Sequence, residues 1–213
     1  MHRTSPWFHV GMIPFTLLYI SPLIFVVAVS LRPFDDITLR GIAALPGALS
    51  FEGFTTAFDA GTRNALLNSA LVTVVTVLVT LLLASMAAFA LSRFRIPFRR
   101  TILLIMLAGN LLPPQILLIP VAKIAEGIGI YDTLAALIVV QVGFGLGFYT
   151  FVLHGFMRGL PNEVFEAARI DGAGAGRIFW QIVLPLSRPS LAALAALATT
   201  WIFNDLIWAM TVL

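Results

Sequence analysis

The residues that could carry chemistry in this chain are few and scattered. The chain has no cysteine and only three histidines, and His154 has no second histidine or acid at ligand spacing. This composition excludes thiol catalysis and argues against metal sites and paired haem ligands. The run Gly172, Gly174 and Gly176 lacks both the following Lys-Ser/Thr and the preceding strand of a phosphate-binding loop. We therefore expect no catalytic residue, no metal and no cofactor bound by this chain.

A second group of residues is polar but lies within apolar sequence. Asp205 is the one acid in such a stretch, and intramembrane carboxylates are often functional. About 26 Å of helix separates Asp205 from Arg188, which places Asp205 close to the outer interface, where ionisation costs little. Buried amides and hydroxyls need partners, either on other helices or on a polar solute. The candidates for contact with a solute are Asn110, Gln115, Gln141, Tyr149, Asn204 and Asp205.

The composition indicates that part of this chain lies in a lipid bilayer. Of its 213 residues, 60% are hydrophobic and 11% are charged. These proportions are those of an integral membrane protein. The formal charge of +3 comes from basic residues dispersed between apolar runs, which argues against a nucleic-acid partner.

Five stretches are long enough to cross a bilayer as helices, since a span needs roughly 20 apolar residues. A cleaved signal peptide is the alternative for the first, because Ala28-Val29-Ser30 resembles a cleavage site, but its twenty uncharged residues exceed the usual length of such a core. We predict an all-α integral membrane fold with five transmembrane helices, within residues 12–31, 64–92, 101–122, 133–157 and 189–213.

The basic residues between these spans predict the orientation. With alternating loops, one side holds nine of the thirteen Lys/Arg residues and the other side holds Arg32, Arg40, Arg63 and Lys123. Cytoplasmic loops carry the excess of positive charge. We therefore expect a cytoplasmic N-terminus, an external loop at residues 32–63 and a cytoplasmic segment at residues 158–188.

That cytoplasmic segment has the pattern of two short helices. Asn162 is a plausible N-cap, Gly172 a natural helix stop, and residues 177–183 form a second helix that Leu184-Pro185 should break. The apolar face of the second helix consists of Ile178, Phe179, Ile182 and Val183. An amphipathic hairpin that only lies on the membrane is the simplest interpretation.

The order of residues in this segment also matches a known sequence signature. Glu166-Ala167-Ala168, Gly172 six residues after the glutamate, and Ile182-x-Leu184-Pro185 resemble the EAA signature of permease subunits of ABC-type importers. Further similarity runs over residues 63–213: Leu67-Asn68-Ser69, Ala87 to Phe94, Pro113-Pro114-Gln115, and Gly129 to Thr133 resemble the smaller membrane subunit of maltose-type sugar importers.

The resemblance implies a set of roles and partners. The hairpin would contain the coupling helices that dock on an ATPase, through Glu166, Ala167, Ala168, Asp171, Gly172, Ile182, Leu184 and Pro185. The chain would be a non-enzymatic subunit in the bacterial inner membrane. Its partners would be a second permease subunit in a heterodimer, two cytoplasmic ATPase subunits that bind ATP-Mg, an external solute-binding protein and membrane lipid.

The resemblance also implies a domain division. Residues 1–62 would form an N-terminal helix and external loop, and residues 63–213 the importer's transmembrane domain. Such subunits usually have a sixth span, so we expect the sequence to be truncated before it. The family commonly has a Trp directly before the Asn-Asp pair, whereas Trp201 precedes Asn204-Asp205 by three residues, which leaves a role for Trp201 in the pathway open.

Two other function classes compete with this interpretation. An ion-coupled secondary transporter would need an intramembrane charge and inverted repeats, and only Asp205 is present. A membrane enzyme or electron-transfer subunit would need a histidine pair or a histidine–acid cluster. The glycines Gly143, Gly145 and Gly147 are expected to allow close helix packing, or a kink, rather than to line a pathway.

Overall fold

The computed structural model describes residues 6–213, and all regular secondary structure in this range is helical. The chain divides into two compact units, Met1–Leu66 and Leu67–Leu213. This division falls close to the predicted domain boundary after residue 62. Each unit is described by itself.

The first unit begins with α1 (Pro6–Ser30), which contains the predicted first span, residues 12–31, except for its last residue. Its segment Gly11–Ser30 has a mean hydropathy of 2.3 and is not buried by other parts of the chain, as expected for a helix surrounded by lipid. Pro14 and Pro22 lie inside this helix. The short helices α2 (Phe34–Arg40) and α3 (Glu52–Ala57) and a π-helical turn, η1 (Phe58–Thr62), complete the unit.

Arg32 organises the loop that follows α1. Its side chain is only 1% exposed, and its Nε donates to Asp36 Oδ2 at 2.8 Å. Its Nη1 donates to the carbonyls of Gly41, Ile42 and Ala44. The hydrogen bond from Arg32 holds the pKa of Asp36 below its usual value, so the ion pair persists until the pH falls through that lowered pKa. In the sequence, Arg32 indicates only the topology of the chain.

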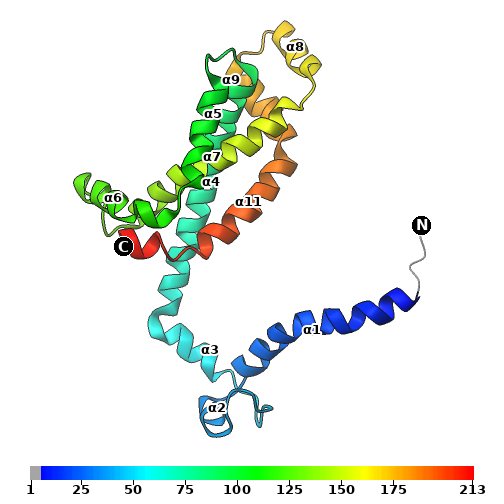
Figure 1. Ribbon diagram of the computed structural model, residues 1–213, viewed down its shortest axis with the longest axis vertical. Coiled ribbons are helices and arrows are strands. Elements are labelled where there is room, and N and C mark those ends of the chain that lie inside the picture. Colours follow the sequence, from blue (N-terminus) through cyan, green and yellow to red (C-terminus); the bar gives the residue numbers. More distant parts are fainter. Residues whose placement is uncertain (1–5) are drawn as a thin grey trace. The chain divides into compact units, whose positions relative to one another are not determined.

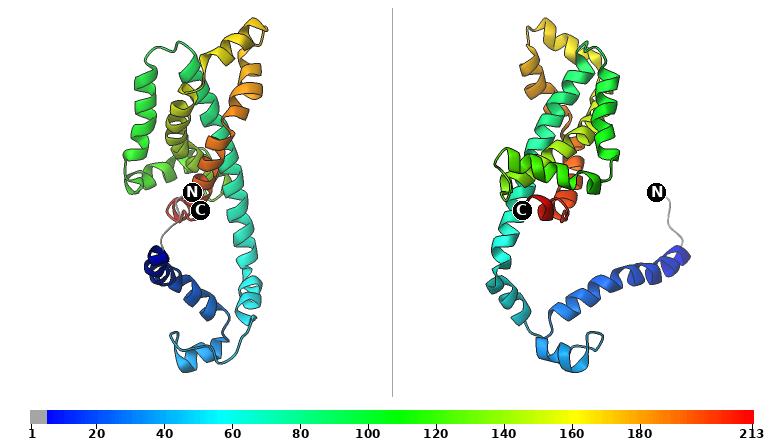
Figure 2. Two further views of the ribbon diagram at one scale, coloured as in Figure 1. Left: turned by 90° about the vertical axis from the view of Figure 1, so that its right-hand side faces the viewer. Right: turned by 60° about the vertical axis from the view of Figure 1, so that its left-hand side comes forward.

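The second unit is built around two long helices, α4 (Arg63–Arg93) and α7 (Leu134–Arg158) (Figure 1). Their mean hydropathies of 2.5 and 2.0 confirm them as candidate membrane spans, in agreement with the predictions at 64–92 and 133–157. Figure 2 shows the remaining helices of this unit gathered around these two. The helix pair α8 (Asn162–Ile170) and α9 (Ala175–Ile178) lies at one end of the unit, and α6 (Pro114–Gly127) and α12 (Ala209–Val212) lie at the other (Figure 1).

The predicted third span, residues 101–122, is not one straight helix. It consists of α5 (Arg99–Ala108), a 3-10 turn, η2 (Gly109–Leu111), and α6 (Pro114–Gly127), and the two parts are bent by 99°. The physical cause is Pro113-Pro114, because a proline has no backbone N–H and excludes the preceding residue from the helical conformation. Leu112 is accordingly extended, with φ −74° and ψ 134°.

The predicted fifth span, residues 189–213, also differs from expectation. Helix α11 (Arg188–Phe203) ends well before Leu213, and α12 (Ala209–Val212) follows after a non-helical break. At the end of α11, the Asn204 side chain donates to the carbonyl of Thr200 at 2.8 Å and so competes with the helical backbone pattern. Among the described residues, three helices are long and apolar enough to span a membrane. The number rises to as many as five if each of two bent pairs counts as one span, namely Arg99–Leu111 with Pro114–Gly127 and Ala175–Leu186 with Arg188–Phe203.

Two of the four glycines of α7, Gly145 and Gly147, act as spacers. A Cβ on Gly147 would lie 2.0 Å from the carbonyl oxygen of Met106, so α5 and α7 are in backbone contact there. A Cβ on Gly145 would lie 3.1 Å from a methyl group of Thr80 on α4. Gly143 faces open space, with nothing within 4 Å of a Cβ, so the packing prediction is wrong for this residue.

Candidate functional site

The first arm of the predicted hairpin is α8 (Asn162–Ile170). Phe165 and Ala168 are buried on its inner face, whereas Glu166 and Ala167 are exposed. Gly172 ends the arm as predicted. Its φ is +78°, and the N–H of Ala173 donates to the carbonyl of Ala168 at 2.9 Å, which satisfies a carbonyl at the helix end.

The predicted N-cap at Asn162 is wrong by one residue. Pro161 occupies the cap position, and Asn162 is the first helical residue. Because Pro161 has no side-chain acceptor, α8 begins without a side-chain cap. The Oδ1 of Asn162 instead accepts a hydrogen bond from Nη1 of Arg93 at 2.6 Å, so the amide serves a contact between helices.

The second arm consists of α9 (Ala175–Ile178), a π-helical turn, η3 (Phe179–Val183), and α10 (Leu184–Leu186). Its predicted apolar face is packed, since Ile178, Phe179 and Val183 are buried. The predicted break at Leu184-Pro185 is wrong, because helical structure continues to Leu186 and the chain bends by 72° at the next residue. In the wider π turn, Leu184 N–H donates to the carbonyl five residues back, which accommodates a proline that cannot continue the α-helical pattern.

The eight residues predicted to dock on an ATPase do not share one surface. Those exposed are Glu166, Ala167, Asp171 and Gly172. Ala168 is buried, and Ile182, Leu184 and Pro185 are half-buried. The exposed group is available to a partner protein, whereas Ala168, Ile182 and Leu184 pack in or against the apolar core shared with the membrane helices. The hairpin belongs to the same apolar core as Ala88 of α4 and Leu153 of α7.

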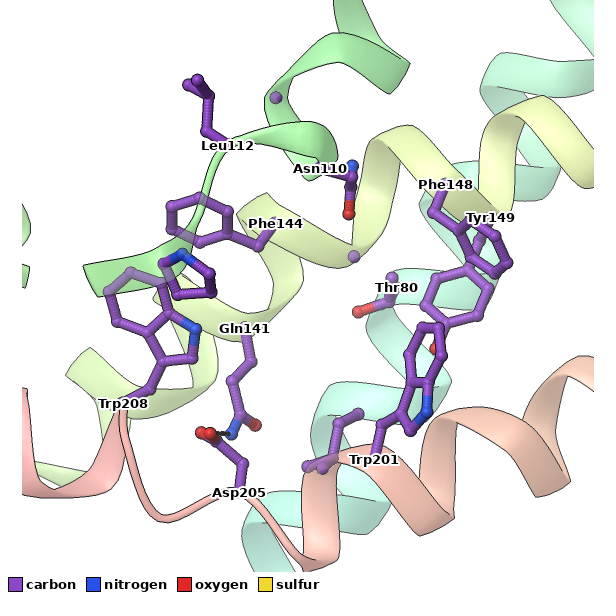
Figure 3. Close-up of a pocket in the computed structure, with 14 residues that line it drawn as sticks. Thr80, Asn110, Leu112, Gln141, Phe144, Phe148, Tyr149, Trp201, Asp205 and Trp208 are labelled. Atoms are coloured by element: carbon purple, nitrogen blue, oxygen red, sulfur yellow. Dashed lines mark hydrogen bonds between the residues drawn. The ribbon is translucent and has the colours of Figure 1, made fainter. Parts of the chain in front are cut away.

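A cavity of about 330 Å³ lies between α4, α7, α11 and the bend after α5 (Figure 3). It brings together four of the six predicted solute-contacting residues, Asn110, Gln141, Tyr149 and Asp205. Gln141 is only 8% exposed, and its Nε2 donates to Asp205 Oδ2 at 2.9 Å. Its Oε1 has no hydrogen-bond partner among the described residues. An unsatisfied buried carbonyl is costly, so this oxygen is a candidate acceptor for a ligand or water.

The other two predicted contact residues do not line this cavity. Gln115 is exposed in the first turn of α6, and Asn204 is bound to its own helix at Thr200. Asp205 follows the end of α11 at Phe203, so the unbroken helix that the 26 Å estimate assumed is not observed. Its partner Gln141 lies seven residues after the start of α7, about 10 Å along that helix.

Most of the aromatic wall of the cavity was not predicted from the sequence. Phe144 stacks on Trp208 with ring centroids 4.6 Å apart, and the ring centroids of Phe148 and Trp201 are 5.5 Å apart. Thr80 of α4 is also part of the lining. The spacing of Gln141, Phe144 and Phe148 was an available signal, because residues three, four and seven apart share one helix face. Trp201 comes to the cavity from α11 itself, and Trp208 comes to it because the chain bends after α11.

These side chains suit an uncharged solute rich in hydroxyl groups. Aromatic rings offer flat apolar faces, and the amides and the carboxylate of Asp205 supply hydrogen-bonding groups. Asp205 is the single charged residue in the lining that the structure describes. No group of three or more metal-ligating side chains is found within the described residues.

The known proteins that this chain resembles are membrane components of transport systems. The family model "Binding-protein-dependent transport system inner membrane component" matches residues 80–213. NgcG, a diacetylchitobiose uptake system permease protein of Streptomyces coelicolor, is 36% identical over 198 residues, which are 92% of this chain and 65% of NgcG. AmyC, a probable starch degradation products transport system permease protein of Thermoanaerobacterium thermosulfurigenes, is 32% identical and covers 89% of this chain and 69% of AmyC. The chain thus spans about two thirds of the length of these relatives.

A solved structure has the same fold. It is the crystal structure of a bacterial ABC transporter involved in the import of the acidic polysaccharide alginate. The TM-score is 0.83 at 24% identity, and the match covers 100% of this chain and 78% of that chain.

Proposed function

This chain belongs to the family of inner membrane components of binding-protein-dependent transport systems, and from that membership we propose that it is a permease subunit of an ATP-driven carbohydrate importer. It is a multi-pass inner-membrane protein. The observation that carries the proposal is the packed hairpin α8–α10, which presents Glu166 and Ala167 at one end of the helical unit. An exposed patch on a rigid support suits docking of a separate ATPase.

The relatives and the cavity both support a carbohydrate as solute. NgcG is named for diacetylchitobiose uptake, and AmyC for starch degradation products. The cavity supplies aromatic faces from Phe144, Phe148 and Trp201 beside the Gln141–Asp205 pair. Because Asp205 repels anions and no basic residue is found in the described lining, we infer that the solute is neutral, unlike alginate.

The proposed mechanism is alternating access driven by partner subunits. This chain would pair with a second permease subunit, and an external binding protein would deliver the solute. Two cytoplasmic ATPases, which bind ATP-Mg, would move the two hairpins together as they close. This chain would contribute part of the pathway and one hairpin, and no catalytic group.

The test is reconstitution of the purified complex in liposomes. We expect uptake of radiolabelled diacetylchitobiose or maltodextrin that requires ATP and the binding protein, and no uptake of an oligouronate.

A second test is crosslinking of the hairpin to the ATPase. Cysteines that replace the exposed hairpin residues Glu166 and Ala167 should crosslink to the ATPase, and each would be the single cysteine of this chain, which contains none of its own. Uptake driven by an ion gradient without ATP would contradict the proposal and favour a secondary transporter.

A further inference from the structure

Arg93, the last residue of α4, is bound to the base of the hairpin. Its Nη1 donates to Asn162 Oδ1, and its Nη2 donates to the carbonyls of Met157 and Leu160. The same guanidinium lies over the ring of Phe165, 3.9 Å from the centroid. One side chain of α4 therefore contacts the end of α7, the connecting loop and α8.

Only an arginine can make this set of contacts. The guanidinium is planar, donates in several directions and stacks on aromatic faces, whereas a lysine ammonium is a point charge on a flexible stem. Met157 lies in the last turn of α7, where carbonyls have no helical partner and a positive charge is favourable. The interaction does not depend on an acid, because Arg93 has no ion pair within the part of the chain that the structure describes.

The same end of α4 also holds the second arm. The ring of Phe89 lies 5.7 Å from that of Phe179 in η3, and both residues belong to the apolar core that the hairpin shares with the long helices. Near its middle, α4 supplies Thr80 to the cavity wall. Thirteen residues separate Thr80 from Arg93, about 20 Å of uninterrupted helix.

We propose that Arg93 is a positioning residue that fastens α8 to α4, so that a movement of the hairpin is passed as a rigid-body displacement to the cavity wall at Thr80. The inference rests on the proposed function, because it assigns a transmission route to the hairpin. Without the guanidinium, α8 would keep only its apolar contacts to the bundle, and a pull on the hairpin would be absorbed at the loop 159–161 instead of moving α4.

The first experiment measures transport per ATP hydrolysed by the reconstituted complex, with diacetylchitobiose as the probe. We expect Arg93→Ala to lower this ratio about tenfold and Arg93→Lys to lower it less, while ATP hydrolysis continues. Asn162→Ala removes a single contact and should have an intermediate effect. The matched control is Arg95→Ala, which removes the same charge from an exposed position two residues away. A ratio unchanged in Arg93→Ala would overturn the inference.

The second experiment needs no transported solute. Spin labels are attached to cysteines replacing Leu78 on α4 and Glu163 on α8, and the distance between them is measured with and without ATP. In the wild type we expect one narrow distribution that ATP does not change, since the two helices move together. In Arg93→Ala, or in Arg93→Lys if the alanine variant does not assemble, the distribution should broaden and shift with ATP. Distributions equal to the wild type in every Arg93 variant that assembles would refute the fastening role.

The two experiments separate failure of the inference from failure of the proposed function. If the wild-type chain neither assembles with an ATPase nor supports ATP-driven uptake of any neutral oligosaccharide, the proposed function is wrong. If the wild type transports and the Arg93 variants behave like Arg95→Ala, only the fastening role is wrong.

Discussion

At Gly172 the chain must turn sharply between the two arms of the hairpin. Its φ of +78° lies in the left-handed region, which costs roughly 1–2 kcal/mol for a residue with a Cβ and more for a β-branched one. A Cβ would meet nothing within 4 Å, so the penalty is purely conformational. This makes Gly172 a site where the hairpin can be strained without a steric clash elsewhere.

We predict that Gly172→Val abolishes ATP-coupled uptake while the protein still inserts in the membrane. The change should alter the angle between α8 and α9 and so misplace the exposed docking residues. Uptake in liposomes and membrane content by immunoblot measure the two effects. Gly176→Ala is the control, since this glycine has no positive φ and also faces open space. Normal uptake by Gly172→Val would count against docking through the hairpin.

Asp205 and Asn204 are adjacent in sequence and have different environments. Asp205 lines the cavity and accepts from Gln141, whereas Asn204 binds the backbone of its own helix. We predict that Asp205→Leu lowers the maximal uptake rate about tenfold, because a hydrogen bond to a charged group contributes about 1.5–3 kcal/mol. Asn204→Ala should change the rate less than about twofold on the same basis. Equal effects of the two substitutions would argue that Asp205 does not contact the solute.

At the scale of elements, the contact between α5 and α7 determines the shape of the cavity. Asn110 comes from the bend after α5, and Gln141, Phe144 and Phe148 come from α7. Their separation depends on the backbone contact at Gly147, where the carbonyl oxygen of Met106 occupies the space of a Cβ. Membrane helices commonly use small residues for such close approach.

We predict that Gly147→Ala separates α5 from α7 and destabilises the protein by about 1–3 kcal/mol, as expected for overpacking against a backbone atom. The melting temperature of the purified subunit or complex in detergent measures the effect. Gly143→Ala, on the same helix and facing open space, should leave the melting temperature unchanged or raise it slightly. An unchanged melting temperature of Gly147→Ala would contradict the prediction, because it would show that α5 and α7 accommodate the added methyl group without loss of stability.

At the scale of the whole molecule, the orientation of the chain in the bilayer stays a prediction from the charge distribution. Nine of thirteen Lys/Arg residues lie on the side assigned to the cytoplasm. The same assignment puts the loop that Arg32 organises outside and the α8–α10 hairpin inside. The proposed function requires this orientation, because ATPase subunits and their nucleotide are cytoplasmic.

We predict that a cysteine replacing Leu45 reacts with a membrane-impermeant maleimide in intact cells, after permeabilisation of any outer membrane, whereas one replacing Ile170 reacts only after lysis. Both residues are highly exposed, at 86% and 85%, so accessibility to the reagent decides the result. The chain should be produced without its partners, so that no docked subunit shields Ile170. Labelling of Ile170→Cys in intact cells would invert the topology and exclude docking of a cytoplasmic ATPase.

The amino-acid sequence by itself determined the class of protein, the apolar segments and the hairpin. Uncharged runs of twenty or more residues indicate membrane helices whatever their neighbours, and the left-handed turn at Gly172 is a local preference of glycine. For the same reason α4 and α7 were predicted within a few residues of their observed ends.

Only the tertiary structure decided where the apolar segments bend and what the bends bring together. Hydropathy reports that a segment prefers lipid, but it does not report direction, so α5–α6 and α11–α12 were each predicted as one straight span. The cavity exists because of these bends: they place Asn110 and Trp208 beside α7. Likewise, Arg93 was only a positive charge in the sequence, because a contact between residues 69 positions apart depends on packing that no local pattern encodes.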